Sequence, residues 1–158
     1  MRKLREAGIH ALPDVVGCTP QGHTDSREFC IEHGFLDKRK SENQEKLKGL
    51  LERTSFLLVP SLAECFGCAY CEANAYGVPN IGRDTGGVSQ AIRPGINGFP
   101  LSPNGDNLDA LADQVKRYLL DPNEYRKLSQ TSPNEYEQPL NWTRLAEKTL
   151  CLLEGAEA

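Results

Sequence analysis

Short apolar stretches alternate with amphipathic stretches along most of this chain, which is the pattern expected of strands alternating with helices. The run SFLLVPS at residues 55–61 is apolar almost throughout, so it predicts a strand covered on both faces of a parallel sheet. Other short runs, several rich in β-branched residues, predict further strands. The complete set of expected strands is 14–18, 28–36, 55–61, 78–82 and 97–102.

The amphipathic and small-residue stretches predict helices at residues 1–8, 41–54, 67–76, 86–92, 107–121, 122–130 and 141–155. Asp106 can cap the helix expected at 107–121. The apolar stripe of that helix consists of Leu108, Leu111, Val115, Tyr118 and Leu119. A polar connection containing proline is expected between the last two helices.

Strands that alternate with helices predict an α/β fold with a parallel, doubly wound, Rossmann-like sheet. A length of 158 residues corresponds to about one domain. No linker is long enough to divide the chain, so we expect residues 1–158 to form a single domain.

Composition excludes several classes of protein. Hydrophobic residues make up 39% of the chain and charged residues 25%, which excludes collagen-like, disulfide-scaffold and mostly disordered proteins. A net charge of -4 gives no general electrostatic reason to bind nucleic acid or an anionic membrane. The N-terminal segment lacks the apolar region of a secretory signal. Six cysteines without such a signal indicate free thiols and a cytoplasmic location.

The segment ECFGCAYCEANAYG, residues 64–77, allows two interpretations. The first depends on its cysteines, because Cys65, Cys68 and Cys71 match the beginning of an iron–sulfur ligand pattern, C-x2-C-x2-C-x3-C-P. Residues 75 and 76 are Ala and Tyr, so the fourth ligand and the proline are both missing. Cysteine also packs as a small apolar residue between a helix and a sheet, which we favour here. A thiol metal-binding protein stays as a remote alternative.

The second interpretation depends on Glu64 and Glu72. The expected strand at 55–61 leads to a loop with Glu64, and a helix begins near Gly67, so unpaired amides face the ligand end of a doubly wound sheet. Gly67 allows a phosphate to approach the backbone closely. Glu72 lies about 7 Å further along the helix axis, at roughly 1.5 Å per residue, a distance that suits a ribose. The spacing fits a nucleotide–diphosphate–sugar across one helix end.

The ordered motifs of residues 59–99 resemble the donor-binding, C-terminal half of the GT-B retaining glycosyltransferases, particularly family 4. Each motif matches a part of that family's pattern. The matching residues are Pro60-Ser61, Glu64, Phe66-Gly67, Glu72-Ala73, Gly77-Val78-Pro79, Gly86-Gly87-Val88 and Gly95-Ile96-Asn97-Gly98-Phe99. Weaker similarity extends over nearly the full chain.

The resemblance implies a transferase of carbohydrate biosynthesis that moves a sugar from a nucleoside-diphosphate sugar to a carbohydrate or lipid acceptor. Retention at the anomeric carbon, no metal ion and no further cofactor are implied as well. Glu64 is the implied catalytic-site residue, which contacts the transferred sugar, and Glu72 is implied to bind the ribose. The other implied donor-binding residues are Phe66, Gly67, Cys68 and Ala69 at the distal phosphate and sugar, Leu36 and Asp37 near the base, and Gly86 and Gly87 at a second helix start.

Some parts of the family pattern are absent. No basic pair for the diphosphate is found in residues 1–30, and the acceptor-binding half that would precede the chain is missing. We therefore expect a fragment that lacks a central strand, so that strands 14–18 and 55–60 pair imperfectly or leave a gap. Such a chain would be marginally stable and inactive alone. The resemblance leaves open whether the parent protein contacts a membrane.

Several residues depart from the family or allow a plainer role. Asn74 is more polar than the usual small helix residues, and Asn80 stands where apolar residues are commoner. Glu64 as a loop cap and Glu72 as a surface residue are the plainer alternatives. We interpret Trp142 as a packing anchor for the last helix. His10, His23 and His33 have no evident partners and are interpreted as exposed or structural.

Two other functions fit the same motifs. One is a degenerate module that binds a nucleotide sugar without turnover. The other is a GT-B relative with different chemistry, a phosphorylase or an epimerase.

Overall fold

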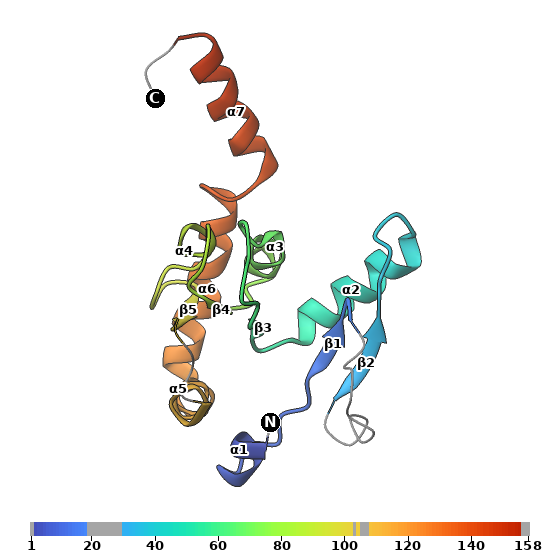
Figure 1. The fold of residues 1–158 in the computed structure, drawn as a ribbon, viewed down its shortest axis with the longest axis vertical. Helices are drawn as coiled ribbons and strands as arrows, with labels where there is room; N and C mark the ends of the chain where they lie inside the picture. Colours follow the sequence, from blue (N-terminus) through green and yellow to red (C-terminus); the bar gives the residue numbers. More distant parts are fainter. Residues whose placement is uncertain (1, 19–29, 103, 105–107, 156–158) are drawn as a thin grey trace. The chain divides into compact units, whose positions relative to one another are not determined.

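The computed structural model describes residues 2–18, 30–102, 104 and 108–155 (Figure 1). The strands are β1 (Asp14–Val16), β2 (Ile31–Gly34), β3 (Leu57–Val59), β4 (Asn80–Arg83) and β5 (Gly98–Leu101). The helices are α1 (Arg2–Glu6), α2 (Ser41–Arg53), α3 (Cys68–Ala75), α4 (Val88–Ala91), α5 (Leu108–Leu120), α6 (Pro122–Glu137) and α7 (Trp142–Leu153). Every expected strand and helix has a counterpart, and the predicted α/β fold with parallel strands is confirmed.

The chain forms two compact units. The first consists of Met1–Arg53 and Asn107–Leu120, and the second of Thr54–Asp106 and Asp121–Ala158. The first unit contains a two-stranded sheet, β1-β2, and the second contains a three-stranded sheet in the order β3-β4-β5. Both sheets are parallel. The gap expected between strands 14–18 and 55–60 concerns strands of different units and stays a prediction.

An ion-pair cluster in the first unit corrects the interpretation of His33. Nε2 of His33 on β2 lies 2.7 Å from Oδ1 of Asp14 on β1, and Nη2 of Arg53 donates to the same oxygen at 2.9 Å. This partner could not be predicted from the sequence, because β1 and β2 are brought together only by parallel pairing, which places Asp14 opposite Ile31. His10 is exposed, and His23 lies outside the described residues.

The core of the second unit lies between its sheet and helices α3 and α4. Tyr70, Val88, Ala91 and Ile92 are buried together, and Leu57 and Val59 of β3 pack against them. Leu58 is 48% exposed, so the expectation of a strand covered on both faces is wrong. Alternate residues of a strand face opposite sides of a sheet, and helices α3 and α4 pack on the side of Leu57 and Val59.

Three buried asparagines connect α3 to β4 and β5. Nδ2 of Asn80 donates to Oδ1 of Asn74 at 2.7 Å and to the carbonyl of Tyr70 at 3.1 Å. Nδ2 of Asn97 donates to the same Oδ1 of Asn74 at 3.2 Å and to the carbonyl of Ala91 at 2.8 Å. The two departures from the family pattern at positions 74 and 80 therefore bind each other, which pairs Nδ2 of Asn80 with Oδ1 of Asn74 away from water.

Helix α6 corrects the expected break near residues 131–140. It continues through Pro133, which lies inside the helix. Tertiary contacts hold this part in helical form: the carboxylate of Glu135 is buried and accepts two bonds from Nη1 of Arg93, at 2.9 and 3.1 Å. Oγ of Ser129 donates to the carbonyl of Gly77 at 2.7 Å. These contacts offset the cost of a proline inside a helix.

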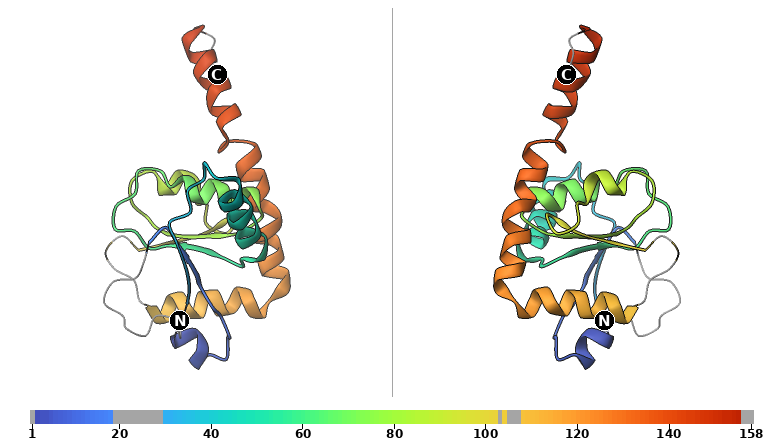
Figure 2. Two further views of the ribbon diagram at one scale, coloured as in Figure 1. Left: turned by 90° about the vertical axis from the view of Figure 1, so that its right-hand side faces the viewer. Right: turned by 90° about the vertical axis from the view of Figure 1, so that its left-hand side faces the viewer.

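Helix α7 follows α6 and projects beyond its end in each view of Figure 2. None of its residues is buried. Trp142 is 77% exposed, so its interpretation as a packing anchor is wrong. The amphipathic pattern of α7 predicts the helix correctly but does not supply a partner for its apolar face. No helix among the described residues is long and apolar enough to cross a membrane.

Candidate functional site

Two loops at the carboxyl ends of β3 and β4 are brought into contact. The amide of Gly87 donates to the carbonyl of Cys65 at 2.7 Å. Gly86 has a φ of 56°, and a Cβ at this position would overlap the carbonyl oxygen of Glu64. Only glycine fits this close approach of two backbones with a positive φ. The predicted site residues Glu64, Gly86 and Gly87 therefore share one place in the structure.

The start of α3 lies next to this contact. Gly67 is the N-cap with a φ of 82° and a ψ of 66°, and no side chain caps the helix. Among the hydrogen bonds of the described residues, none has the amide of Phe66, Gly67, Cys68 or Ala69 as its donor. The first amides of a helix have no partner within the helix itself. Four neighbouring amides are thus available to an acceptor.

Glu64 lies beside these amides. Its Cγ is 3.5 Å from the place that a Cβ on Gly67 would take, and the residue is half-buried. Burial raises the pKa of the Tyr70 hydroxyl, and the negative charge of Glu64 raises it further. Glu72 lies on α3 and is half-buried. The structure thus places both predicted carboxylates at α3, one before its start and one within it.

Tyr70 fixes α3 on the sheet, a role that the sequence analysis missed. Its hydroxyl donates to the carbonyl of Val59 on β3 at 3.2 Å. A Cβ at Gly82 of β4 would overlap that hydroxyl, so glycine is required there. A glycine inside an apolar strand was the available signal, because it often marks a close approach.

The start of α4 is less open than that of α3. Helix α4 has only four residues, the amide of Gly87 is bound to Cys65, and the amide of Val88 donates to Thr85 at 3.2 Å. In this structure Gly86 and Gly87 serve the contact between the two loops. Their predicted role toward the donor stays a prediction.

Leu36 and Asp37 belong to the first unit. Leu36 is buried. The carboxylate of Asp37 accepts from Nε of Arg39 at 2.9 Å and from Nη2 at 2.9 Å, and this pairing lowers the pKa of Asp37. The side chain of Asn43 donates to the carbonyl of Asp37 at 3.2 Å. The loop after β2 is therefore internally bonded, and its predicted position near the base stays a prediction.

The three cysteines of the segment differ in exposure. Cys65 and Cys68 are exposed and Cys71 is buried. Burial raises the pKa of the Cys71 thiol to about 11, with smaller contributions from Cys68 and Glu72. Such a thiol stays protonated near neutral pH and behaves as a small apolar group. Within the described part of the chain, no three His, Cys, Asp or Glu side chains are grouped so that they could hold a metal ion.

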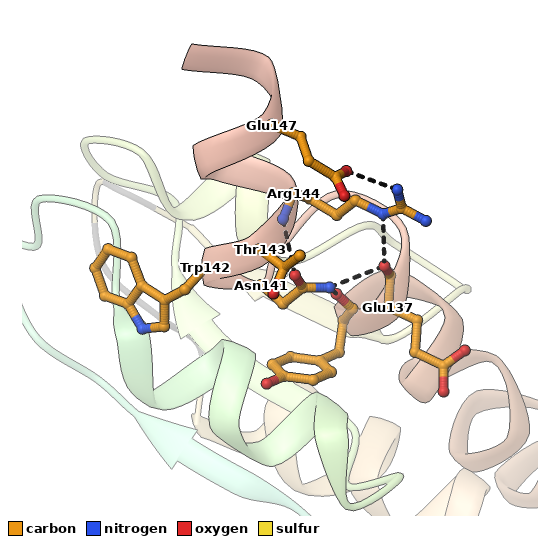
Figure 3. A pocket seen from close by; sticks show the side chains of 7 residues that line it. Glu137, Asn141, Trp142, Thr143, Arg144 and Glu147 are labelled. Atoms are coloured by element: carbon orange, nitrogen blue, oxygen red, sulfur yellow. Dashed lines mark hydrogen bonds and ion pairs between the residues drawn. The ribbon is translucent and has the colours of Figure 1, made fainter. Parts of the chain in front are cut away.

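A hollow of about 430 Å³ lies at the junction of α6 and α7 (Figure 3). Asn141 caps α7 by accepting from the amide of Arg144 at 3.0 Å, and its Nδ2 donates to the carbonyl of Glu137 at 2.9 Å. Nη1 of Arg144 pairs with Glu147 at 2.7 Å. These four polar residues of the lining thus bind one another. None of the predicted site residues lines it.

Solved structures of other proteins share the fold of this chain. Sucrose-phosphate synthase from Thermosynechococcus elongatus matches with a TM-score of 0.70 and 24% identity, over 90% of this chain and 37% of the other. Anabaena HepE in complex with UDP matches with a TM-score of 0.70 and 18% identity, over 90% of this chain and 40% of the other. At these identities the similarity establishes the fold.

Curated proteins are also similar to this chain in sequence. D-inositol 3-phosphate glycosyltransferase of Nocardiopsis dassonvillei is 28% identical over 117 residues, which cover 74% of this chain and 27% of the relative. Sucrose synthase of Nitrosomonas europaea is 23% identical over 146 residues, which cover 82% of this chain and 18% of the relative. The chain thus spans about a quarter of these relatives or less. Residues 37–135, more than half of the chain, match the family described as glycosyl transferases group 1. The chain therefore belongs to the group 1 glycosyl transferases.

Proposed function

We propose that this chain is the donor-binding region of a retaining glycosyltransferase, which moves a sugar from a nucleoside-diphosphate sugar to an acceptor. The observation that carries the proposal is the group of four amides at the start of α3, which have no partner among the described residues. A helix start combines such amides with a partial positive charge, and both favour an anion such as a diphosphate. A chain with a net charge of -4 needs a local arrangement of this kind to bind an anion.

The two carboxylates determine which way the nucleotide sugar lies across this anion site. Glu72 lies further along α3 and accepts hydrogen bonds from the ribose hydroxyls. Glu64 lies ahead of the helix, and its carboxylate contacts hydroxyls of the transferred sugar. The bond between Gly87 and Cys65 holds the loop that carries Glu64, so this side chain needs little reordering when the donor binds.

The chemistry assigned to this region is electrostatic. In glycosyl transfer from a nucleoside-diphosphate sugar, negative charge grows on the departing diphosphate. Amides that already point at the diphosphate stabilise this charge without reorganisation in the transition state. UDP is present in the structure of Anabaena HepE, which shares this fold and so supports a uridine nucleotide as the first ligand to test. The acceptor is bound elsewhere in the parent protein.

The proposal is tested by titrating the 158-residue chain with UDP and GDP in a calorimeter. We expect one nucleotide to bind, and Glu72→Gln to weaken its binding about tenfold, because hydrogen bonds to a charged acceptor are worth about 1.5 to 3 kcal/mol. Glu45→Gln is the matched control, since Glu45 is an exposed helical glutamate on α2. It should leave the affinity unchanged.

Two results would contradict the proposal. One is the absence of binding by any nucleoside diphosphate to a folded chain. The other is an equal loss of affinity in Glu72→Gln and Glu45→Gln, which would indicate a non-specific electrostatic effect. Transfer of the sugar with retention is tested in the parent protein, by following the anomeric configuration of the product with NMR.

A further inference from the structure

Two thiols on the proposed donor loop have no role in the proposed function. Cys65 and Cys68 are both exposed, and they stand on either side of Phe66 and Gly67. The third cysteine of the segment, Cys71, is buried, and its pKa of about 11 keeps it protonated. The accessible thiols of the segment are therefore a pair separated by two residues.

The position of this pair is that of a redox motif. The loop with Cys65 follows β3, and α3 begins at Cys68, so the pair joins a strand to a helix start. A Cys-x-x-Cys pair next to a βαβ pattern indicates dithiol–disulfide chemistry. Between the two cysteines the chain turns, with bends at Cys65 and Phe66 and a left-handed φ of 82° at Gly67. Bends shorten the path between the two Cα atoms, and a disulfide needs them about 4.4 to 6.8 Å apart.

We propose that Cys65 and Cys68 form a reversible disulfide that weakens nucleotide binding at the start of α3. The co-reactant is a small-molecule disulfide such as oxidised glutathione. The second half of the proposal, the effect on binding, rests on the proposed function. The first half, formation of the Cys65–Cys68 disulfide, does not depend on the proposed function.

The exchange is balanced in two steps. One cysteine thiolate attacks a sulfur of oxidised glutathione, which forms a mixed disulfide and releases one glutathione thiol. The second cysteine loses its proton and attacks the protein sulfur of the mixed disulfide, which releases the other glutathione. The protein loses two electrons and two protons, and oxidised glutathione becomes two molecules of glutathione.

The disulfide acts on the amides through geometry. It closes a small ring that contains Phe66 and Gly67, and it brings the two Cβ atoms to about 3.8 Å from each other. The amides inside this ring, those of Phe66, Gly67 and Cys68, are three of the four that face the proposed diphosphate. The carbonyl of Cys65 is held by Gly87, and the Phe66 amide lies in the same planar peptide, so the ring closes mainly by rotating the two peptides that carry the amides of Gly67 and Cys68. Rotated amides no longer point at one anion.

The test treats the 158-residue chain with oxidised glutathione, maps disulfides by mass spectrometry of peptides, and measures UDP affinity before and after. We expect a Cys65–Cys68 disulfide and about tenfold weaker binding, the loss expected when a charged acceptor loses a hydrogen bond. Dithiothreitol should restore the affinity. Cys68→Ser should keep a stable mixed disulfide with glutathione at Cys65, because the resolving thiol is gone.

Cys151→Ser is the control, because Cys151 is an exposed thiol on α7. It should retain the full response to oxidation, whereas Cys65→Ser should show the same UDP affinity in oxidising and reducing buffer. If the reduced protein binds UDP but oxidised glutathione produces no Cys65–Cys68 disulfide, the proposed disulfide is refuted. If the disulfide forms but the affinity for UDP is unchanged, the proposed effect of the disulfide on nucleotide binding is refuted. Reduced protein that fails to bind UDP overturns both the proposed function and the effect of oxidation on binding. In that case the peptide map alone shows whether the Cys65–Cys68 disulfide forms.

Discussion

The sheet of the second unit packs on helices that bury its apolar side chains, whereas the sheet of the first unit leaves many of its apolar residues in solvent. Tyr70, Val88, Ala91 and Ile92 are almost completely buried in the second unit. In the first unit, Leu12, Val16, Ile31 and Phe35 are exposed around the pair of β1 and β2. A two-stranded sheet is marginal in water unless other elements cover it.

This difference has a functional meaning. The proposed donor amides and both carboxylates belong to the unit with the better core, so their backbone positions rest on packing. The loop with Leu36 and Asp37 belongs to the other unit, and its shape rests on local hydrogen bonds. Residues held by packing tolerate little change, whereas locally bonded residues tolerate more. Four predictions test this contrast, from the largest expected effect to the smallest.

Gly86→Val should have the largest effect. Its Cβ would overlap the carbonyl oxygen of Glu64, and the φ of 56° is unfavourable for a β-branched residue. We expect about 3 kcal/mol of destabilisation by urea unfolding and loss of UDP binding. In the first unit, Gly49→Ala meets nothing within 4 Å and lies inside α2, so it should stabilise by about 0.5 to 1 kcal/mol. Equal effects of the two substitutions would refute the contrast.

Features that depend on neighbouring residues were predicted from the sequence, whereas features that depend on long-range packing were not. Local patterns predicted every strand and helix, because each depends on neighbouring residues. Glu64 lies on the loop after β3, as expected, whereas Gly86, expected to open a helix at 86–92, lies in the turn before α4. The partnership of Asn74 with Asn80 was not foreseen, since it depends on the register between α3 and β4. The continuation of α6 through Pro133 likewise depends on a contact with Arg93, which is distant in sequence.

Asn80→Val should have the second largest effect. It leaves Oδ1 of Asn74 with the single donor Asn97, and it removes the bond to the carbonyl of Tyr70. An unsatisfied buried polar group costs about 1 to 3 kcal/mol. Adding Asn74→Met should recover much of this loss, because Nδ2 of Asn74 and Oδ1 of Asn80 already have no partner within the described part of the chain.

A double-mutant cycle measures the coupling of these asparagines by urea unfolding of the wild type, both single variants and the double variant. We expect a coupling energy of about 1 kcal/mol or more. Simple additivity of the two single losses would mean that the pair does not specify the position of α3.

Asp14→Asn in the first unit should cost less, about 1 kcal/mol. Its carboxylate pairs with His33 and Arg53, but the side chain of Arg53 is mostly exposed, and water screens such pairs. Chemical unfolding in low and high salt checks the prediction, and the loss should shrink in high salt. A loss as large as that of Asn80→Val would show that the ion-pair cluster is as well packed as the asparagine network.

Cys71→Ala should have the smallest effect, visible mainly in alkaline solution. Burial raises the pKa of the Cys71 thiol from its ordinary value of 9.0 to about 11 in the folded chain. Between these values the unfolded chain binds fewer protons than the folded one, so the free energy of unfolding falls as the pH rises from 9 to 11. Burial also raises the pKa of Tyr70 and Tyr125, and their contributions persist in the variant. Urea unfolding of both proteins at several pH values should therefore show a decline in each that is less steep for Cys71→Ala. Identical slopes would mean that water reaches the thiol, and that α3 packs less tightly on the sheet than its buried neighbours indicate.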